Sequence, residues 1–200
     1  MKRLITILIV LFVSGYCFAQ NSLNECRDSL QWHFNNDTAF DYGNNISKWQ
    51  YCIQGKQMPE LSLETITGKK IETKDFKGKV IVINLWFTAC QPCIAELPAL
   101  NRLVKEYENK NVVFFGLCTD TREILDSQFF SKYKFDFIII PNARNIVEEK
   151  IGNTGFPTTY IIDKKGRVID AWIGGAMDKT AETAAYLKAK PIIDELLKAE

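Results

Sequence analysis

Residues 80–98 read VIVINLWFTACQPCIAELP, and this stretch decides the fold. From Val80 to Phe87 it is β-branched, aromatic or otherwise apolar apart from Asn84, a composition typical of a strand buried on both faces. From Cys93 onward, apolar residues recur at three- and four-residue steps, which is helical spacing. The sequence therefore predicts a strand that passes into a helix, with Cys90 at the N-terminus of that helix.

Two cysteines, Cys90 and Cys93, lie at this transition. The thiolate is the nucleophile in thiol chemistry, and the free N–H groups and macrodipole of a helix N-terminus stabilise it. Cys90 is therefore expected to be acidic and exposed, and Cys93, one turn on, lies within reach of a mixed disulfide at Cys90. Pro92 suits a first helical turn, where no N–H is needed. The spacing predicts a two-step exchange in which Cys90 attacks and Cys93 resolves.

The same C-x-x-C spacing also occurs in static disulfides and in zinc sites. A zinc site needs two further ligands, but the chain has no second C-x-x-C, and its one histidine, His33, lies far upstream. The strand-to-helix position favours a redox-active pair. No metal is expected, and His33 is interpreted as a surface or packing residue.

The N-terminus has the pattern of an export signal. A basic start precedes an apolar run from Leu4 to Val13, and Cys17 and Ala19 stand at −3 and −1 before Gln20. This run is too short to span a bilayer comfortably. We expect residues 1–19 to be a cleaved signal peptide and the protein to be periplasmic. Lipidation at Cys17, whose surroundings fit a lipobox poorly, and an uncleaved anchor are the alternatives, and either would tether the exported chain to a membrane.

The charges of the chain are balanced. With 25 basic and 24 acidic residues, the formal net charge is +1. Such a chain has no strong field to attract nucleic acid or an anionic membrane. The length that remains after residue 19 suits one domain with an extension, and we place the domain at residues 57–200.

The predicted extension covers residues 20–56. It is polar and Asn-rich, with scattered aromatics and no sustained period, which predicts an irregular or short-helical segment packed onto the main domain. Cys26 and Cys52 bracket this segment. In an oxidising compartment the simplest inference is that they form a structural disulfide, although free thiols or another pairing stay open.

The remainder of the chain alternates strand and helix patterns. A helix from Cys90 to about residue 110, kinked at Pro98, and a strand at 112–118 make a βαβ unit with parallel strands. Cys118, inside that strand, is interpreted as an inert buried thiol. The other expected elements are a hairpin (59–63 and 70–73), a helix at 121–132, a strand at 135–140, a short helix at 145–150, a second hairpin (160–162 and 167–173), and helices at 180–187 and 191–197.

This order of elements resembles the thioredoxin fold, and more narrowly the exported TlpA/ResA group of thiol–disulfide oxidoreductases, over residues 57–197. The residues that carry the resemblance are Asn84, Trp86, Cys90–Cys93, Glu96–Pro98, Gly155–Thr158 and Ile161–Asp163. The resemblance implies an α/β fold with a central mixed β-sheet flanked by helices, preceded by an N-terminal β-hairpin and the irregular extension.

The resemblance also implies roles for single residues. Pro157 would be a cis-proline lying against the cysteine pair, although the base rate alone predicts a trans bond. Phe156 and Pro157, together with Trp86, would bind substrate, with the Phe156 backbone pairing to an extended segment. Glu96 would tune thiol ionisation, the alternative being a solvated helix residue. Ala89 stands where the family often has Trp, so the rim of the site is expected to be more open.

Three functions follow as hypotheses. The first is an exported protein-disulfide oxidoreductase without a cofactor, reducing proteins such as apocytochromes and recharged by an upstream membrane-linked thiol donor. The second is a thiol peroxidase of the same fold, which requires a Thr three residues before the cysteine, whereas Thr88 is two before Cys90. The third is a metal carrier, which requires C-x-x-x-C and a distal histidine that the sequence lacks.

Overall fold

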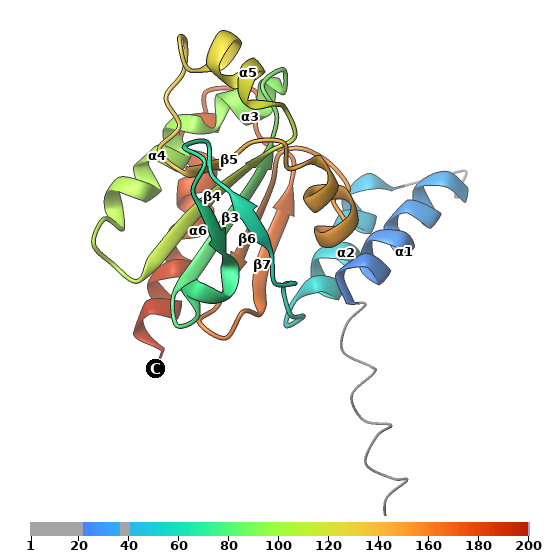
Figure 1. Cartoon of the computed structure of the whole chain (residues 1–200). Helices are drawn as coiled ribbons and strands as arrows, with labels where there is room; N and C mark the ends of the chain where they lie inside the picture. Colours follow the sequence, from blue (N-terminus) through green and yellow to red (C-terminus); the bar gives the residue numbers. More distant parts are fainter. Residues whose placement is uncertain (1–21, 37–40, 200) are drawn as a thin grey trace, which may run out of the picture.

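The computed structural model describes residues 22–36 and 41–199. The expected signal peptide, including Cys17, lies outside the described residues. A five-stranded sheet with strand order β5-β4-β3-β6-β7 forms the centre, with helices packed on both faces (Figure 1). Its strands are β3 (Val80–Trp86), β4 (Val112–Cys118), β5 (Ile138–Ile140), β6 (Thr158–Ile162) and β7 (Val168–Ile173).

The sheet is mixed, as the resemblance implied. β3 is buried along its whole length and pairs in parallel with β4, from Val80 opposite Val112 to Trp86 opposite Cys118. On its other side β3 runs antiparallel to β6, which forms a hairpin with β7. The predicted βαβ unit and both predicted hairpins are confirmed, the first hairpin joining β1 (Ser62–Glu64) and β2 (Lys70–Glu72).

The helical elements include several short turns. They are α1 (Ser22–Asn36), α2 (Tyr42–Ile53), the 3-10 turn η1 (Thr73–Phe76), α3 (Gln91–Ala95), α4 (Leu97–Glu106), α5 (Arg122–Ile124), the π-helical turns η2 (Leu125–Phe129) and η3 (Ile146–Ile151), and α6 (Ala181–Lys198). Within the described residues, no helix is both long and apolar enough to cross a membrane.

The sheet separates two apolar clusters. On one face, Ile83 and Leu85 of β3 pack with the N-terminal helices. On the other face, Val82 and Trp86 pack with α4 and α6 and with the cysteine pair. Because neighbouring residues of a strand point to opposite faces, the continuous apolar run of β3 supplies both clusters.

The sequence predicted an irregular or short-helical extension, and most of its described part is helical, in α1 and α2. In α1 the buried residues Leu23, Cys26 and Leu30 lie on one side, and in α2 the buried residues include Trp49 and Ile53. These buried stripes are narrow. Apolar residues on the exposed side of the helices, such as Trp32, Phe34 and Tyr51, therefore made the helical period hard to detect in the sequence.

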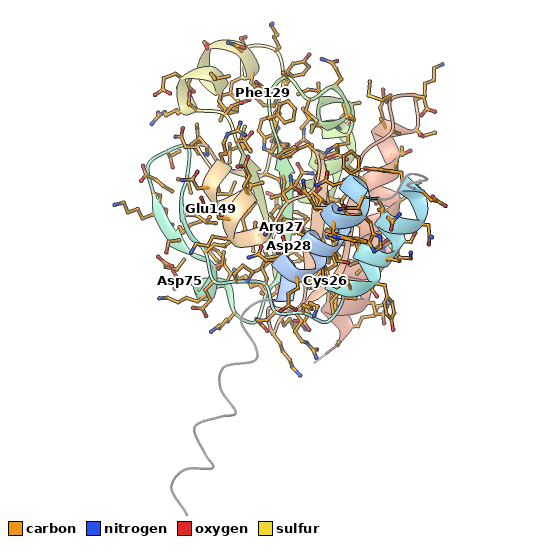
Figure 2. All side chains as sticks on the ribbon, turned by 90° about the vertical axis from the view of Figure 1, so that its right-hand side faces the viewer. Cys26, Arg27, Asp28, Asp75, Phe129 and Glu149 are labelled. Carbon is orange, nitrogen blue, oxygen red and sulfur yellow. A yellow bond between two sulfur atoms is a disulfide. The ribbon has the colours of Figure 1, made fainter. Side chains whose placement is uncertain are left out.

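The predicted pairing of Cys26 with Cys52 is present in the structure. The two sulfurs are bonded at 1.98 Å with a Cα–Cα distance of 5.8 Å, so the disulfide joins α1 to α2. Figure 2 shows α1 beside η3, where Arg27 donates a hydrogen bond to the carbonyl oxygen of Glu148 at 2.9 Å. The two helices of the extension are therefore joined to each other by the disulfide and to the domain by the Arg27 hydrogen bond.

Other boundaries differ from the sequence prediction. α6 is one continuous helix that includes Pro191, where two helices were expected. The predicted helix at 121–132 ends at Phe129, and the predicted strand at 135–140 begins only at Ile138, which leaves the buried residues Phe135 and Phe137 outside regular structure. The helix is interrupted at Glu96, which separates α3 from α4, two residues before the kink predicted at Pro98.

Candidate active site

The cysteine pair sits where β3 gives way to α3. Cys90 is the N-cap residue of α3, with extended backbone angles of φ −80° and ψ 100°, and Pro92 lies in the first turn. Cys90 and Cys93 are joined by a disulfide with an S–S distance of 1.97 Å and a Cα–Cα distance of 5.2 Å. The Cys90 Sγ also accepts a hydrogen bond from the Cys93 backbone N–H at 3.3 Å. This donor would stabilise a Cys90 thiolate after reduction.

The expected exposure of Cys90 is not observed in this oxidised state. Cys90 is 5% exposed and Cys93 is 1% exposed. Phe87, Ile94 and Phe156 pack against their cluster, while Ala89 is exposed beside them. The sequence could not reveal this shielding, because Phe156 comes from a distant segment of the chain.

The peptide bond between Phe156 and Pro157 is cis, as the resemblance implied. Phe156 is half-buried, and its ring packs edge-on against Phe87 at a centroid distance of 5.2 Å. A methyl group placed on Gly175 would come within 3.3 Å of both the Pro157 Cγ and the Pro92 carbonyl oxygen. Pro157 therefore lies close to the first turn of α3.

Glu96 is not the solvated helix residue of the alternative interpretation. It is 3% exposed, and its Oε1 accepts a hydrogen bond from Asn84 Nδ2 at 2.9 Å. Burial raises the pKa of Glu96 from its ordinary 4.5 to about 7, although the Asn84 hydrogen bond lowers it in part. A carboxyl group with this pKa can accept and release a proton near neutral pH.

Trp86, predicted to bind substrate, is buried and offers no side-chain surface at the site. Its side chain is fully buried on the α4 and α6 face of the sheet and packs against Phe129 and Phe135, with ring centroids 4.6 and 5.3 Å away. Its Nε1 has no hydrogen-bond partner. Trp86 is two residues beyond Asn84 in β3, so both side chains point to the same face and only the packing of distant residues decides their surroundings.

Two residues near the cysteines were not predicted as site residues. Thr88 donates hydrogen bonds from both its backbone N–H and its hydroxyl to Asp120 Oδ2, each at 2.7 Å. These bonds hold the loop that precedes Cys90. No local pattern indicated this contact, because Asp120 follows β4 and Thr88 follows β3.

The remaining thiol and histidine lie outside this site. Cys118 is fully buried as predicted, and burial raises the pKa of its thiol to about 12. His33 lies on α1, with its ring edge-on to Trp32 at 5.0 Å. Among residues 22–36 and 41–199, no three His, Cys, Asp or Glu side chains are placed to hold a metal ion.

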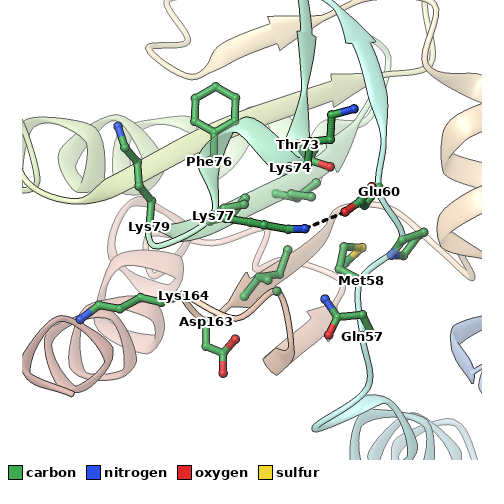
Figure 3. Close-up of a pocket in the computed structure, with 15 residues that line it drawn as sticks. Gln57, Met58, Glu60, Thr73, Lys74, Phe76, Lys77, Lys79, Asp163 and Lys164 are labelled. Atoms are coloured by element: carbon green, nitrogen blue, oxygen red, sulfur yellow. Dashed lines mark hydrogen bonds and ion pairs between the residues drawn. The ribbon is translucent and has the colours of Figure 1, made fainter. Parts of the chain in front are cut away.

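Two pockets differ in size and in their position relative to the cysteines. The pocket in Figure 3 has a volume of about 40 Å³ and is lined by the Lys77–Glu60 ion pair and by Ile81, near the start of β3. It lies at the opposite end of β3 from the cysteines and holds only a few waters. A groove of about 340 Å³ lies instead beside Glu96, where Trp172 and Lys188 also line it.

The chain has clear relatives among characterised families. The sequence pattern of the Redoxin family matches residues 53–187. The thiol-disulfide oxidoreductase ResA of Bacillus cereus is 35% identical over 147 residues, which cover 74% of this chain and 84% of that protein. The thioredoxin-like protein YneN of Bacillus subtilis is 34% identical over 148 residues, covering 72% and 86%.

A solved structure agrees with the fold. A thiol:disulfide interchange protein of the thioredoxin family from Chlorobium tepidum matches with a TM-score of 0.58 at 20% identity, covering 70% of this chain and 95% of that one. That likeness concerns the fold alone, while the ResA match is 35% identical over 74% of this chain. The chain therefore belongs to the Redoxin family and is a protein-disulfide oxidoreductase of the ResA type with a thioredoxin-like fold.

Proposed function

We propose that this chain is an exported reductant that exchanges disulfides with partner proteins through Cys90 and Cys93. The observation that carries the proposal is the disulfide between these residues at the start of α3, close to the cis peptide bond of Pro157. Two sulfurs already within bonding distance require little rearrangement to cycle between dithiol and disulfide.

The proposed reaction has two exchanges. The Cys90 thiolate attacks one sulfur of a partner disulfide, forming a mixed disulfide and releasing the other partner sulfur as a thiolate. Cys93 then loses its proton to Glu96 and attacks Cys90, which frees the second partner thiolate. The partner gains two electrons, and the enzyme is left with the Cys90–Cys93 disulfide.

Substrate binding is assigned to the surface beside Cys90. The Phe156 backbone, next to the cis bond, would pair with an extended partner segment in the manner of an added strand. The rings of Phe156 and Phe87 and the exposed Ala89 make this surface apolar and open. A partner cysteine flanked by apolar residues would suit it.

Export and partners belong to the same proposal. The basic and apolar N-terminus supports transport to the periplasm, with or without a membrane tether. Suitable partners are oxidised exported proteins, including apocytochromes during cytochrome c maturation. A membrane-linked thiol donor would then return Cys90 and Cys93 to the dithiol state, because each turnover consumes two electrons.

The thiol peroxidase alternative receives no support from the loop before Cys90. The Thr88 hydroxyl, which would have to assist peroxide, donates to Asp120 Oδ2 at 2.7 Å. Because the Thr88 hydroxyl proton is donated to Asp120, it is not directed toward a peroxide bound at Cys90.

Insulin reduction with a dithiol donor tests the proposal. Cys90→Ala should abolish turnover, and Cys93→Ala should do the same while trapping mixed disulfides with partner proteins in cell extracts. Cys118→Ala is the matched control and should retain wild-type turnover, since this thiol is buried and outside the site. Undiminished insulin reduction by Cys90→Ala would refute the assignment, as would efficient peroxide consumption in place of insulin reduction.

A further inference from the structure

Three buried polar side chains form a network on the α4 and α6 face of the sheet. Asn84 of β3 is 1% exposed, Glu96 between α3 and α4 is 3% exposed, and Thr159 of β6 is fully buried. Asn84 Nδ2 donates to Glu96 Oε1 at 2.9 Å and to Thr159 Oγ1 at 3.0 Å. Every other residue of β3 is apolar. Burying the Asn84 amide would destabilise the fold if its polar atoms had no hydrogen-bond partners, so these two bonds offset that cost.

When Glu96 is ionised, the chemistry of the partners fixes the direction of these bonds. An amide nitrogen carries two hydrogens, and here each one has its own acceptor. An ionised carboxylate can only accept, so the amide oxygen of Asn84 could not replace the nitrogen opposite Glu96. Asn84 therefore favours the ionised form of Glu96, and Thr159 holds the amide in the plane that reaches it.

The network also distinguishes the two carboxylate oxygens. Oε1 of Glu96 is occupied by Asn84. A methyl group placed on Gly175 would lie 3.5 Å from Glu96 Oε2 and 3.3 Å from both the Pro157 Cγ and the Pro92 carbonyl oxygen. Oε2 is therefore the carboxylate oxygen nearer to Gly175, the residue that also lies beside Pro157 and the Pro92 carbonyl group.

We propose that Asn84, held by Thr159, is a positioning residue that binds one oxygen of Glu96 and presents the other to Cys93. The inference rests on the proposed function, in which Glu96 takes the Cys93 proton. The proton moves from the Cys93 Sγ to Oε2. The Cys93 thiolate then forms the bond to Cys90 as the bond between Cys90 and the partner breaks, and the departing partner thiolate takes that proton.

Other titratable groups near Glu96 could also change the pH dependence of the reaction. Cys90 and Cys93 on α3 titrate themselves once reduced, and Lys188 of α6 lines the groove beside Glu96. Asn84 and Thr159 carry no charge. Because the Asn84 hydrogen bond opposes the effect of burial on the pKa of Glu96, its loss should raise that pKa further.

Stopped-flow reaction of the reduced Cys90–Cys93 pair with a chromogenic aromatic disulfide tests the inference. One chromophore is released as Cys90 attacks, and a second as Cys93 resolves, so the second phase reports on Cys93. We expect Asn84→Leu to raise the pH of the inflection of this phase by about one unit and to slow it about tenfold below the inflection. Thr159→Val should shift the inflection in the same direction by less, which keeps the test valid if Asn84→Leu does not fold.

Two comparisons separate positioning from simple support of the fold. In a Glu96→Gln background, Asn84→Leu and Thr159→Val should no longer move the inflection. Thr158→Val removes a hydroxyl that donates to the Gly155 carbonyl oxygen at 2.6 Å, outside the network, and should leave the inflection in place. Equal shifts with and without Glu96, or no shift in either variant, would overturn the inference for Asn84. An inflection that Glu96→Gln itself leaves unchanged would instead remove Glu96 as proton acceptor, and the inference with it.

Discussion

The charge of Glu96 links the active site to the stability of the fold. Burial raises its pKa from 4.5 to about 7, so the folded protein keeps this proton over a pH range in which the unfolded chain has lost it. An acid whose pKa is higher in the folded state stabilises folding least when it is ionised in both states. Its contribution therefore becomes less favourable as the pH rises from about 4.5 to about 7.

Glu96→Gln should remove this pH dependence. We expect the free energy of unfolding of the wild type to fall by roughly 2 to 3 kcal/mol relative to that of the variant between pH 5 and pH 7.5. Urea unfolding of both oxidised proteins across this range measures the difference, and groups that titrate alike in both proteins cancel. Parallel stability profiles would contradict the assigned burial of an ionisable carboxyl group.

The sequence predicted those site residues whose role depends on local spacing. Cys90 and Cys93 are placed by the transition from β3 to α3, and Pro157 followed from the family pattern before the last hairpin. Trp86 and Asn84 are two residues apart on one buried strand, yet one fills the core and the other binds Glu96. Their difference depends on side chains from distant segments, which periodicity does not reveal.

At the scale of elements, strongly apolar segments were predictable and weakly patterned ones were not. β4 begins and ends where its apolar run predicted, because that run is buried along nearly its whole length. α1 contributes only a narrow stripe of buried residues, so its helical period was lost among polar positions. Pro191 was expected to start a helix but lies inside α6, a position where it is disfavoured unless packing compensates.

The Cys26–Cys52 disulfide is predicted to stabilise α1 and α2 without taking part in exchange. It closes a separation of 26 residues, for which loop entropy predicts a stabilisation of about 3 to 4 kcal/mol. We expect the double variant Cys26→Ala and Cys52→Ala to lose about that much in urea unfolding, while its insulin reduction under native conditions stays at the wild-type rate. Loss of turnover in a folded double variant would show that this disulfide participates in the reaction.

At the scale of the whole molecule, the two faces of the sheet have different roles. The face with α4 and α6 carries the cysteine pair and the buried polar network. The opposite face is covered in part by α1 and α2, with Trp49 packed edge-on against Tyr160 of β6 at a centroid distance of 6.1 Å. Tyr160 follows Thr159 in β6, and their side chains point to opposite faces of the sheet. The extension therefore packs against the reverse face of the strand that carries Thr159 and stabilises it.

This support predicts that the extension cannot be removed, although the Redoxin pattern begins only at residue 53. Four of its large apolar side chains are buried in the shared cluster: Leu23, Leu30, Trp49 and Ile53. At about 1.5 to 3 kcal/mol each, their burial is comparable with the total stability of a typical domain. A chain beginning at Gln57 should therefore aggregate or unfold at much lower urea concentration than the full chain.

Size-exclusion chromatography and urea unfolding of that truncated chain provide the measurement. Trp49→Ala in the full chain is the graded comparison, with an expected loss of about 3 to 5 kcal/mol from a truncated core aromatic. A truncated chain with the urea midpoint of the full chain would contradict the argument. It would show that the sheet buries enough apolar surface without α1 and α2, and that the boundary predicted at Gln57 separates an independent domain from an appendage.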